Sequence, residues 1–211
     1  MASSKRNFDI EAAAWDEEPR RVQLAKDLFR AISEEVVLNP SMDALDFGCG
    51  TGLVTLQLSA RVGHVKGVDS SQGMLDVLER KIQSYPIENV MTRRVDLDCG
   101  DVLDGLYDLV VTTMTLHHIR EVMPLIEQFA RVLKLGGRLC IADLDVEDGA
   151  FHGNNEGVFH LGFDRCVLRD SLSKAGIIDI NDRTAAAVVK PDATGKMKTF
   201  NVFLMTGRRT Q

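Results

Sequence analysis

The sequence predicts a doubly wound α/β fold, in which helices cover both faces of a mostly parallel sheet. Three observations lead to this prediction. Between residues 42 and 144, short apolar runs alternate with longer amphipathic stretches, which is the pattern of parallel strands joined by crossover helices. A turn with three glycines at alternate positions follows the first apolar run. Two extended stretches near the C-terminus have no helix between them.

The first predicted helix covers residues 20–37, where apolar residues recur at intervals of three and four positions. Pro19 suits its first turn, and Asn39-Pro40 ends it. The strands that follow are expected at residues 42–46, 64–69, 90–95, 106–112 and 138–144. The helices between them are expected at residues 51–60, 72–83 and 122–133.

The C-terminal part has a different pattern. Residues 165–175 are predicted to form a helix with Asp164 as its N-cap and Gly176 as its C-terminal stop. Residues 177–189 and 199–206 are predicted to be extended, joined by a turn at 190–195. Because strands joined without a crossover helix run antiparallel, we expect a hairpin that closes the sheet.

Composition indicates one globular domain that spans residues 1–211. Hydrophobic residues make up 45% of the chain, charged residues make up 27%, and no Pro/Gly/Ser-rich linker interrupts them. The formal charge of −6 argues against nucleic acid as a partner, because phosphate binding draws on clustered Lys and Arg. The four cysteines have no zinc-ligand spacing, which suits a reducing compartment. No window is apolar enough for a membrane span, so we expect a cytoplasmic protein.

The glycine-rich turn is the strongest functional signal. It reads Asp46-Phe47-Gly48-Cys49-Gly50-Thr51-Gly52 and lies between a predicted strand and a predicted helix. Such glycines let the backbone approach a ligand, and the helix N-terminus offers free N–H groups. A dinucleotide-binding turn has the pattern GxGxxG, but Leu53 stands where its third glycine would be. Asp46 suits the ammonium of an amino-acid cofactor better than a pyrophosphate, although a dinucleotide site and a structural loop stay open as alternatives.

Residues 45–52 resemble the first signature of the class I S-adenosylmethionine-dependent methyltransferases. The turn at residues 133–138 is similar to the family's LKPGG turn, with Leu135 in place of the proline. The resemblance covers residues 43–207 and implies a Rossmann-like sheet of seven strands, mostly parallel with an antiparallel C-terminal strand. The other matching motifs are Gly67-Val68-Asp69-Ser70-Ser71, Asp96-Leu97-Asp98, and Tyr107 to Thr113 followed by Leu116-His117-His118-Ile119.

The resemblance implies S-adenosyl-L-methionine as the cofactor and S-adenosyl-L-homocysteine as the product. It assigns the ribose hydroxyls to Asp69 and the adenine to Asp96-Leu97-Asp98. Phe8-Asp9 and Ala14-Trp15-Asp16 resemble an N-terminal helical cap over the cofactor, which divides the domain into a cap at 1–40 and a catalytic core at 41–211. In the alternative, Trp15 only packs the first helix onto the core. The implied cofactor-binding residues are Trp15, Asp46, Gly48, Cys49, Gly50, Thr51, Gly52, Asp69, Ser70, Met74, Asp96, Leu97 and Thr112.

The acceptor is predicted to be a small molecule rather than a nucleic-acid base. Enzymes of this fold that methylate exocyclic base amines carry an Asn/Asp-Pro-Pro-aromatic sequence after the fourth strand, where this chain has Thr112-Thr113-Met114-Thr115. The Pro-Cys nucleophile that serves methylation of cytosine at carbon 5 is also absent from the sequence. The chain is most similar to the group that includes the quinone-biosynthesis C-methyltransferases. A quinone-like or amino-bearing metabolite is therefore expected.

The segment from Asp143 to Phe163 is the expected acceptor loop, because it leaves the carboxyl end of a parallel strand and is long for a connection. We predict His117, His152 and His160 as catalytic residues that contact the acceptor or accept its proton. The alternative is that these imidazoles make structural hydrogen bonds. Carboxylates and imidazoles are metal ligands, but their spacing here matches no metal motif, and no metal is predicted.

The predicted function is transfer of a methyl group from S-adenosylmethionine to a small-molecule acceptor by in-line displacement. The cofactor supplies the activated leaving group, so the protein mainly aligns the reactants and excludes water. The alternatives are a protein acceptor, a non-catalytic cofactor-binding protein and, remotely, a nicotinamide-dependent oxidoreductase. The sequence predicts neither the methylated atom nor the oligomeric state.

Overall fold

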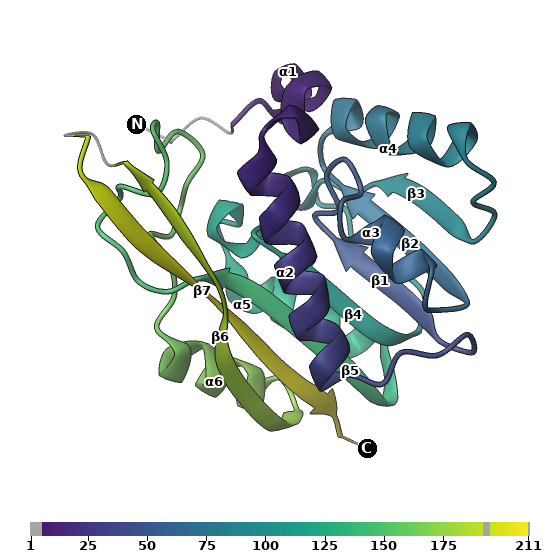
Figure 1. Cartoon of the computed structure of the whole chain (residues 1–211). Coiled ribbons are helices and arrows are strands. Elements are labelled where there is room, and N and C mark those ends of the chain that lie inside the picture. Colours follow the sequence, from purple (N-terminus) through teal and green to yellow (C-terminus); the bar gives the residue numbers. More distant parts are fainter. Residues whose placement is uncertain (1–5, 192–194, 211) are drawn as a thin grey trace.

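The protein folds around one twisted sheet (Figure 1). The structure, a computed structural model, describes residues 6–191 and 195–210. Within these residues the sheet has seven strands in the order β3-β2-β1-β4-β5-β7-β6. The first five strands pair in parallel, and only β7 runs against its neighbours. The strands are β1 (Asp43–Phe47), β2 (His64–Asp69), β3 (Val90–Arg94), β4 (Tyr107–Thr113), β5 (Leu133–Leu144), β6 (Ile177–Pro191) and β7 (Met197–Arg209).

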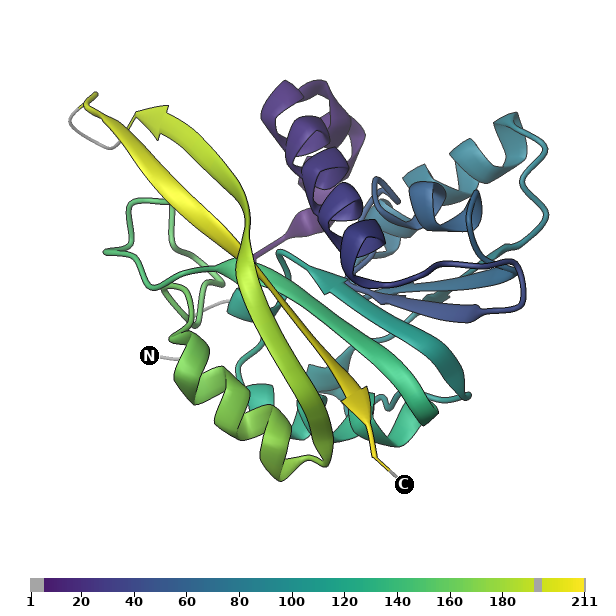
Figure 2. The same ribbon diagram turned by 60° about the horizontal axis from the view of Figure 1, so that its bottom comes forward.

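Helices cover both faces of this sheet, as the sequence predicted (Figure 2). One face packs against α2 (Pro19–Glu35), α3 (Thr55–Ser59) and α4 (Gln72–Ser84). The other packs against α5 (Val122–Val132) and α6 (Arg165–Lys174). The fully buried side chains of Leu28 and Ile32 anchor α2, and Phe129 of α5 meets Phe47 of β1 with ring centroids 5.4 Å apart. Both layers together bury the two faces of the parallel strands.

Helix α2 follows directly from its sequence. Pro19 occupies its first turn, where the missing N–H costs no hydrogen bond, and the Glu18 side chain accepts from the Arg20 N–H. The helix ends at Glu35 because Val36 is extended. Two short helical segments precede it, within the helical cap that the resemblance implied at residues 1–40 but with bounds that the sequence did not predict. They are α1 (Phe8–Glu11) and the 3₁₀ segment η1 (Ala12–Glu17).

The C-terminal hairpin was also predicted correctly. β6 pairs with β7, and β7 pairs with β5, in both cases antiparallel. Asp164 caps α6 by accepting from the N–H groups of Cys166 and Val167, and Gly176 follows the helix at a φ of +82°. The turn predicted at 190–195 includes residues 192–194, which lie outside the described residues.

The helix predicted at residues 51–60 was wrong at its start. Residues 51–54 form turns, and α3 covers only Thr55–Ser59. The reason is the backbone at Gly52, whose φ of +84° is incompatible with a right-handed helix. The N-terminus of α3 therefore begins beyond the glycine-rich turn instead of at its last glycine.

None of the helices within the described residues is long and apolar enough to cross a membrane.

Candidate active site

A cavity of about 690 Å³ opens at the carboxyl ends of the parallel strands. Its walls come from the turns after β1, β2 and β4, from the N-terminal helices, from the 145–163 loop and from β6. This edge is where open parallel sheets bind ligands. The structure places ten of the thirteen predicted cofactor-binding residues on the cavity wall, namely Trp15, Gly48, Cys49, Gly50, Thr51, Asp69, Ser70, Met74, Asp96 and Leu97.

The glycine-rich turn is held to the next strand of the sheet. The backbone N–H groups of Gly48 and Cys49 both donate to the Val68 carbonyl of β2, at 2.8 and 3.1 Å. A Cβ atom at Gly48 would lie 2.2 Å from the Thr115 hydroxyl, so this position has no room for a side chain. A Cβ atom at Gly50, by contrast, would meet nothing within 4 Å and would project into open space at the cavity wall. The space beside Gly50 is therefore large enough for a ligand to contact the backbone.

Asp69 joins the two turns that border the cavity. One carboxylate oxygen accepts from the Gly50 N–H at 2.8 Å, and the other accepts from the Ser71 N–H at 2.9 Å. Each carboxylate oxygen has lone pairs for more than one donor. The side chain therefore fixes the shape of the glycine-rich turn and still faces the cavity.

Beyond Asp69, a second acidic turn completes this end of the cavity. Asp96 follows β3, is 8% exposed and accepts from the Asp98 N–H at 3.2 Å. Its own N–H donates to Asp101 at 2.9 Å. These bonds leave Leu97 on the cavity wall between the two acidic residues. An apolar side chain flanked by acceptors suits a flat heterocycle with an exocyclic amine.

The N-terminal segment docks onto the turns after β1 and β2 through two aspartates. Asp9 accepts from the Ser71 hydroxyl at 2.5 Å and from the Gly73 N–H at 2.8 Å, and these bonds lower its pKa. Asp16 accepts from the Thr51 hydroxyl at 2.6 Å. Trp15 lines the cavity beneath the Arg21 guanidinium, which lies 3.7 Å from the centre of the indole ring. The segment thus contacts both the glycine-rich turn and α4.

Three predicted cofactor residues, Asp46, Gly52 and Thr112, are not on the cavity wall. Asp46 is 1% exposed and accepts from the Thr55 hydroxyl at 2.7 Å. Burial raises its pKa to about 7, with a contribution from the nearby charge of Asp69. At Gly52 a Cβ atom would lie 2.3 Å from Leu78, so this glycine lets α4 approach. Thr112 is buried in β4, where it pairs with Phe47 of β1.

The other end of the cavity contains a group of imidazoles. His117 and His118 lie on the short 3₁₀ segment η3 (Leu116–His118) after β4, and His152 lies on the 145–163 loop. Burial is the main reason that the pKa of His118 falls to about 4 and that of His152 to about 3, with the neighbouring His117 as the next cause. Both rings are therefore neutral at pH 7.

His160, the third predicted catalytic residue, does not line the cavity. Its Nε2 lies 2.9 Å from the Ile119 carbonyl, and its ring stacks near Phe163 with centroids 5.1 Å apart. The side chains of His117 and His152 therefore share the cavity wall, whereas His160 meets His117 only through its backbone N–H, which donates to the His117 carbonyl at 3.3 Å.

Sequence reasoning missed two polar residues that line this end of the cavity, Arg6 and Lys190, and it misplaced Asp143. Asp143 was treated as part of the loop, but it lies within β5, is fully buried and contacts His117. Burial opposes ionisation of Asp143, yet His117 and backbone donors keep its pKa below the ordinary value. An acidic residue in an otherwise apolar buried strand was the signal that could have identified it.

The comparisons with known proteins agree with this geometry. Residues 44–137, which include the glycine-rich turn and the turns after β2, β3 and β4, match a family model described as a methyltransferase domain. This stretch is a methyltransferase domain, and its motifs and the order of its strands resemble those of the class I S-adenosylmethionine-dependent methyltransferases. Such methyltransferases use S-adenosylmethionine as their cofactor, and ten of the residues that the sequence predicts to bind it line the cavity described above.

The relatives of this chain are similar to it over part of their length. An uncharacterized methyltransferase of Schizosaccharomyces pombe is 36% identical over 121 residues, which are 54% of this chain and 42% of the relative. A demethylmenaquinone methyltransferase of Lysinibacillus sphaericus is 34% identical over 49% of this chain and 45% of its own. The chain thus spans less than half the length of these two relatives. The crystal structure of the YcgJ protein of Bacillus subtilis has the same fold, with a TM-score of 0.74 and 16% identity over 87% of this chain and 98% of that one.

The first prediction concerns Gly50. We expect Gly50→Val to abolish binding of S-adenosylmethionine in calorimetric titration, because a side chain there fills the space that the cofactor needs. Gly100→Val is the matched control, since Gly100 also has a positive φ and open space around a Cβ but lies outside the cavity wall. Both variants place a valine at a positive φ, so both carry backbone strain. Equal affinity in the two variants would refute a ligand-binding role for the turn.

The second prediction concerns Asp69. Hydrogen bonds to a charged group are worth about 1.5–3 kcal/mol, so Asp69→Ala should weaken cofactor binding roughly ten- to hundredfold. Asp76→Ala on the exposed side of α4 removes a carboxylate without touching the cavity and should leave the affinity unchanged. An unaltered dissociation constant for Asp69→Ala would contradict the ribose assignment.

The third prediction concerns the pH dependence of stability. The native state holds a proton on Asp46 up to a pKa of about 7, whereas the unfolded state loses it near pH 4. The native state therefore binds more protons in this range, and Asp46 lowers stability as the pH rises from 4 to 7. Asp46→Asn should remove this loss, which amounts to about 1.4 kcal/mol per unit of pKa shift.

Urea unfolding of the cofactor-free protein at pH 4.5 and pH 7.5 measures this effect. We expect the difference in free energy of unfolding, Asp46→Asn minus parent, to be larger at pH 7.5 than at pH 4.5. Asp76→Asn should show no such difference, because Asp76 is exposed. Parallel pH profiles for the parent and Asp46→Asn would show that Asp46 is ionised in the native state.

Proposed function

We propose that the chain transfers a methyl group from S-adenosylmethionine to a small-molecule acceptor that binds in the second half of the cavity. The observation that carries this proposal is the continuity of the cavity. It extends from the cofactor-binding turns to an apolar region formed by α2, the loops after β4 and β5, and β6. The apolar side chains of this region are Leu24, Leu28, Met114, Phe151 and Val188.

The residues present fit the proposed cofactor. Gly50 offers open space beside the glycine-rich turn, Asp69 faces the cavity with two carboxylate oxygens, and Leu97 lies between two acidic residues. When bound, S-adenosylmethionine supplies an activated methyl group and its own leaving group. The protein's task is to align the acceptor, exclude water and receive a proton where the acceptor has one to lose.

The acceptor region combines apolar walls with one ammonium group. Lys190 of β6 lines the cavity, and its Nζ lies 4.3 Å from the centre of the Phe151 ring. Burial lowers its pKa, and no ion pair holds it within the described residues. A desolvated cation beside an apolar wall favours an acceptor with an apolar body and an anionic or strongly polar group.

His117 and His152 lie at the same end of the cavity, and in this proposal they contact the acceptor. Asp143 accepts from the Nδ1–H of His117 at 2.7 Å and so leaves its Nε2 unprotonated in the neutral ring. The names of similar proteins are in line with a small acceptor, since demethylmenaquinone methyltransferases are among the relatives. A protein acceptor and a non-catalytic cofactor-binding role are outcomes that the assay distinguishes.

The fourth prediction tests this function. Incubation with S-adenosylmethionine and a panel of apolar acids, phenols and quinols should produce S-adenosylhomocysteine with at least one acceptor class. For an anionic acceptor, Lys190→Met should raise KM about tenfold or more while the cofactor affinity stays unchanged. Lys198→Met is the control, because Lys198 pairs with Asp148 away from the cavity.

If the chain methylated only protein substrates, the acceptor would be a protein and the proposed small-molecule acceptor would be wrong. Tight cofactor binding without product from any acceptor would favour the non-catalytic role. If Lys198→Met raised KM as much as Lys190→Met did, the assignment of Lys190 to the acceptor would be wrong.

A further inference from the structure

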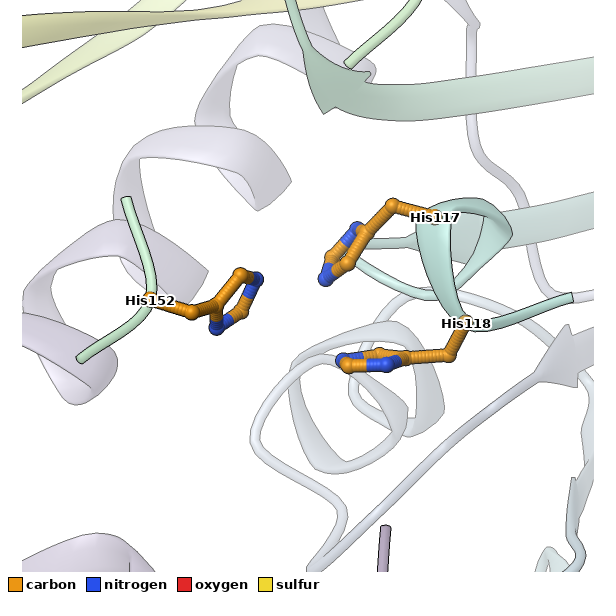
Figure 3. A group of neighbouring side chains, drawn as sticks. All are labelled: His117, His118 and His152. Carbon is orange, nitrogen blue, oxygen red and sulfur yellow. The ribbon is translucent and has the colours of Figure 1, made fainter. Parts of the chain in front are cut away.

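Three imidazoles from two separate segments converge at the acceptor end of the cavity. Figure 3 shows the rings of His117, His118 and His152 pointing toward one another across a small gap. One ring nitrogen from each residue can be chosen so that all three lie within 4.8 Å of one another. The ring centroids are 4.1 Å apart for His117 and His118, and 5.1 and 5.5 Å apart for the pairs with His152.

The rings of His117 and His118 are oriented by hydrogen bonds of the kind that orient metal-binding histidines. His117 Nδ1 lies 2.7 Å from Asp143 Oδ1, and His118 Nδ1 lies 2.7 Å from the Gly157 carbonyl. Both partners are acceptors, so both Nδ1 atoms carry the ring proton and both Nε2 atoms have a free lone pair. A carboxylate or carbonyl on the far nitrogen is the usual way in which proteins orient a histidine ligand and raise its basicity.

His152 supplies the third ring and an unsatisfied atom. Its Nε2 is buried without a hydrogen-bond partner, which is costly for a polar atom. Its Nδ1 lies 3.4 Å from the Arg6 guanidinium, and Arg6 is engaged by Glu11 at 2.6 and 2.7 Å. The contact between His152 and Arg6 is long and therefore weak. If Nε2 coordinated a metal ion, the ring proton would move to Nδ1. The weak contact between His152 and Arg6 would then be lost, and a metal bond would replace it.

We propose that His117, His118 and His152 bind a divalent transition-metal ion of the zinc class, with a fourth position open to the cavity. Three imidazoles and one exchangeable position form the ligand set of a catalytic zinc site. In tetrahedral geometry at about 2.0–2.1 Å from the ion, ligand nitrogens lie about 3.3–3.4 Å apart, so the group must contract. In this contraction His152 moves toward the other two rings, because its loop contains little regular secondary structure.

The site goes beyond the proposed methyl transfer and can be tested without it. All three histidines line the cavity, so the fourth position faces the region assigned to the acceptor. A hydroxyl or thiol bound there would lose its proton to solvent and bind as the anion, because a cation of this charge lowers the pKa of its ligands. No metal motif is visible along the chain because His152 is distant in sequence from the adjacent pair His117 and His118.

The fifth prediction tests the metal directly. Protein stripped with EDTA is titrated with Zn²⁺ by calorimetry and with Co²⁺ by visible absorption, both without S-adenosylmethionine. We expect one ion per chain with a dissociation constant of about 1 µM or tighter. His152→Ala should weaken zinc binding about 100-fold or more, and Asp143→Asn should weaken it about 10- to 100-fold.

The matched control is His160→Gln on the same loop. Glutamine retains a donor for the Ile119 carbonyl, and His160 lies outside the cavity, so zinc affinity should not change. His118→Ala provides a second ligand variant if Asp143→Asn fails to fold. Absence of zinc binding, or equal affinity in His152→Ala and His160→Gln, would overturn the proposal.

A parallel titration with S-adenosylmethionine on the metal-free samples separates the two proposals. Cofactor binding without zinc binding contradicts only the metal site. Zinc binding without any product from the acceptor panel contradicts only the proposed function.

Discussion

The structure depends on a backbone constraint at the carboxyl ends of β1 and β2. Gly48, Gly50 and Gly52 all have positive φ values, and this conformation turns the chain back so that two N–H groups donate to the Val68 carbonyl. Asp69 then accepts from the Gly50 N–H and fixes the turn against β2. A residue with a side chain adopts such angles only at a cost in free energy. The cavity, the N-terminal segment and the proposed cofactor site are all built against this turn.

Much of the fold could be predicted because its signals are local. β2 has the bounds that its apolar run predicted, and α2 and α6 are defined by a proline, an aspartate cap and a glycine stop. The helix expected from residue 51 failed where the geometry of Gly52 overrides the apolar pattern. The resemblance implied a helical cap before α2, but the bounds of α1 and η1 could not be predicted because hydrogen bonds to distant residues hold them, as those of Asp9 to Ser71 and Gly73 show.

The candidate site divides in the same way. The cofactor end follows from contiguous motifs, so sequence alone could place Gly50, Asp69 and Leu97 on one wall. The acceptor end is assembled from segments that are distant along the chain. Asp143 meets His117 only because β5 lies beside β4 in the sheet, and His152 meets that pair only because its loop folds back over η3. No pattern along the chain encodes these contacts.

The two aspartates of the N-terminal segment also have a thermodynamic consequence. Asp16 accepts from the Thr51 hydroxyl, and Asp9 accepts from the Ser71 hydroxyl. Thr51 lines the cavity itself, and Ser71 directly follows Ser70, which also lines it. The docked residues 8–17 and a ligand in the cavity would therefore contact the same two turns. A ligand that orders these turns favours the docked segment, and by reciprocity the docked segment tightens the ligand by the same factor. The segment and a ligand bound at these turns would then act as linked ligands of one core, so that release of either one would loosen the other.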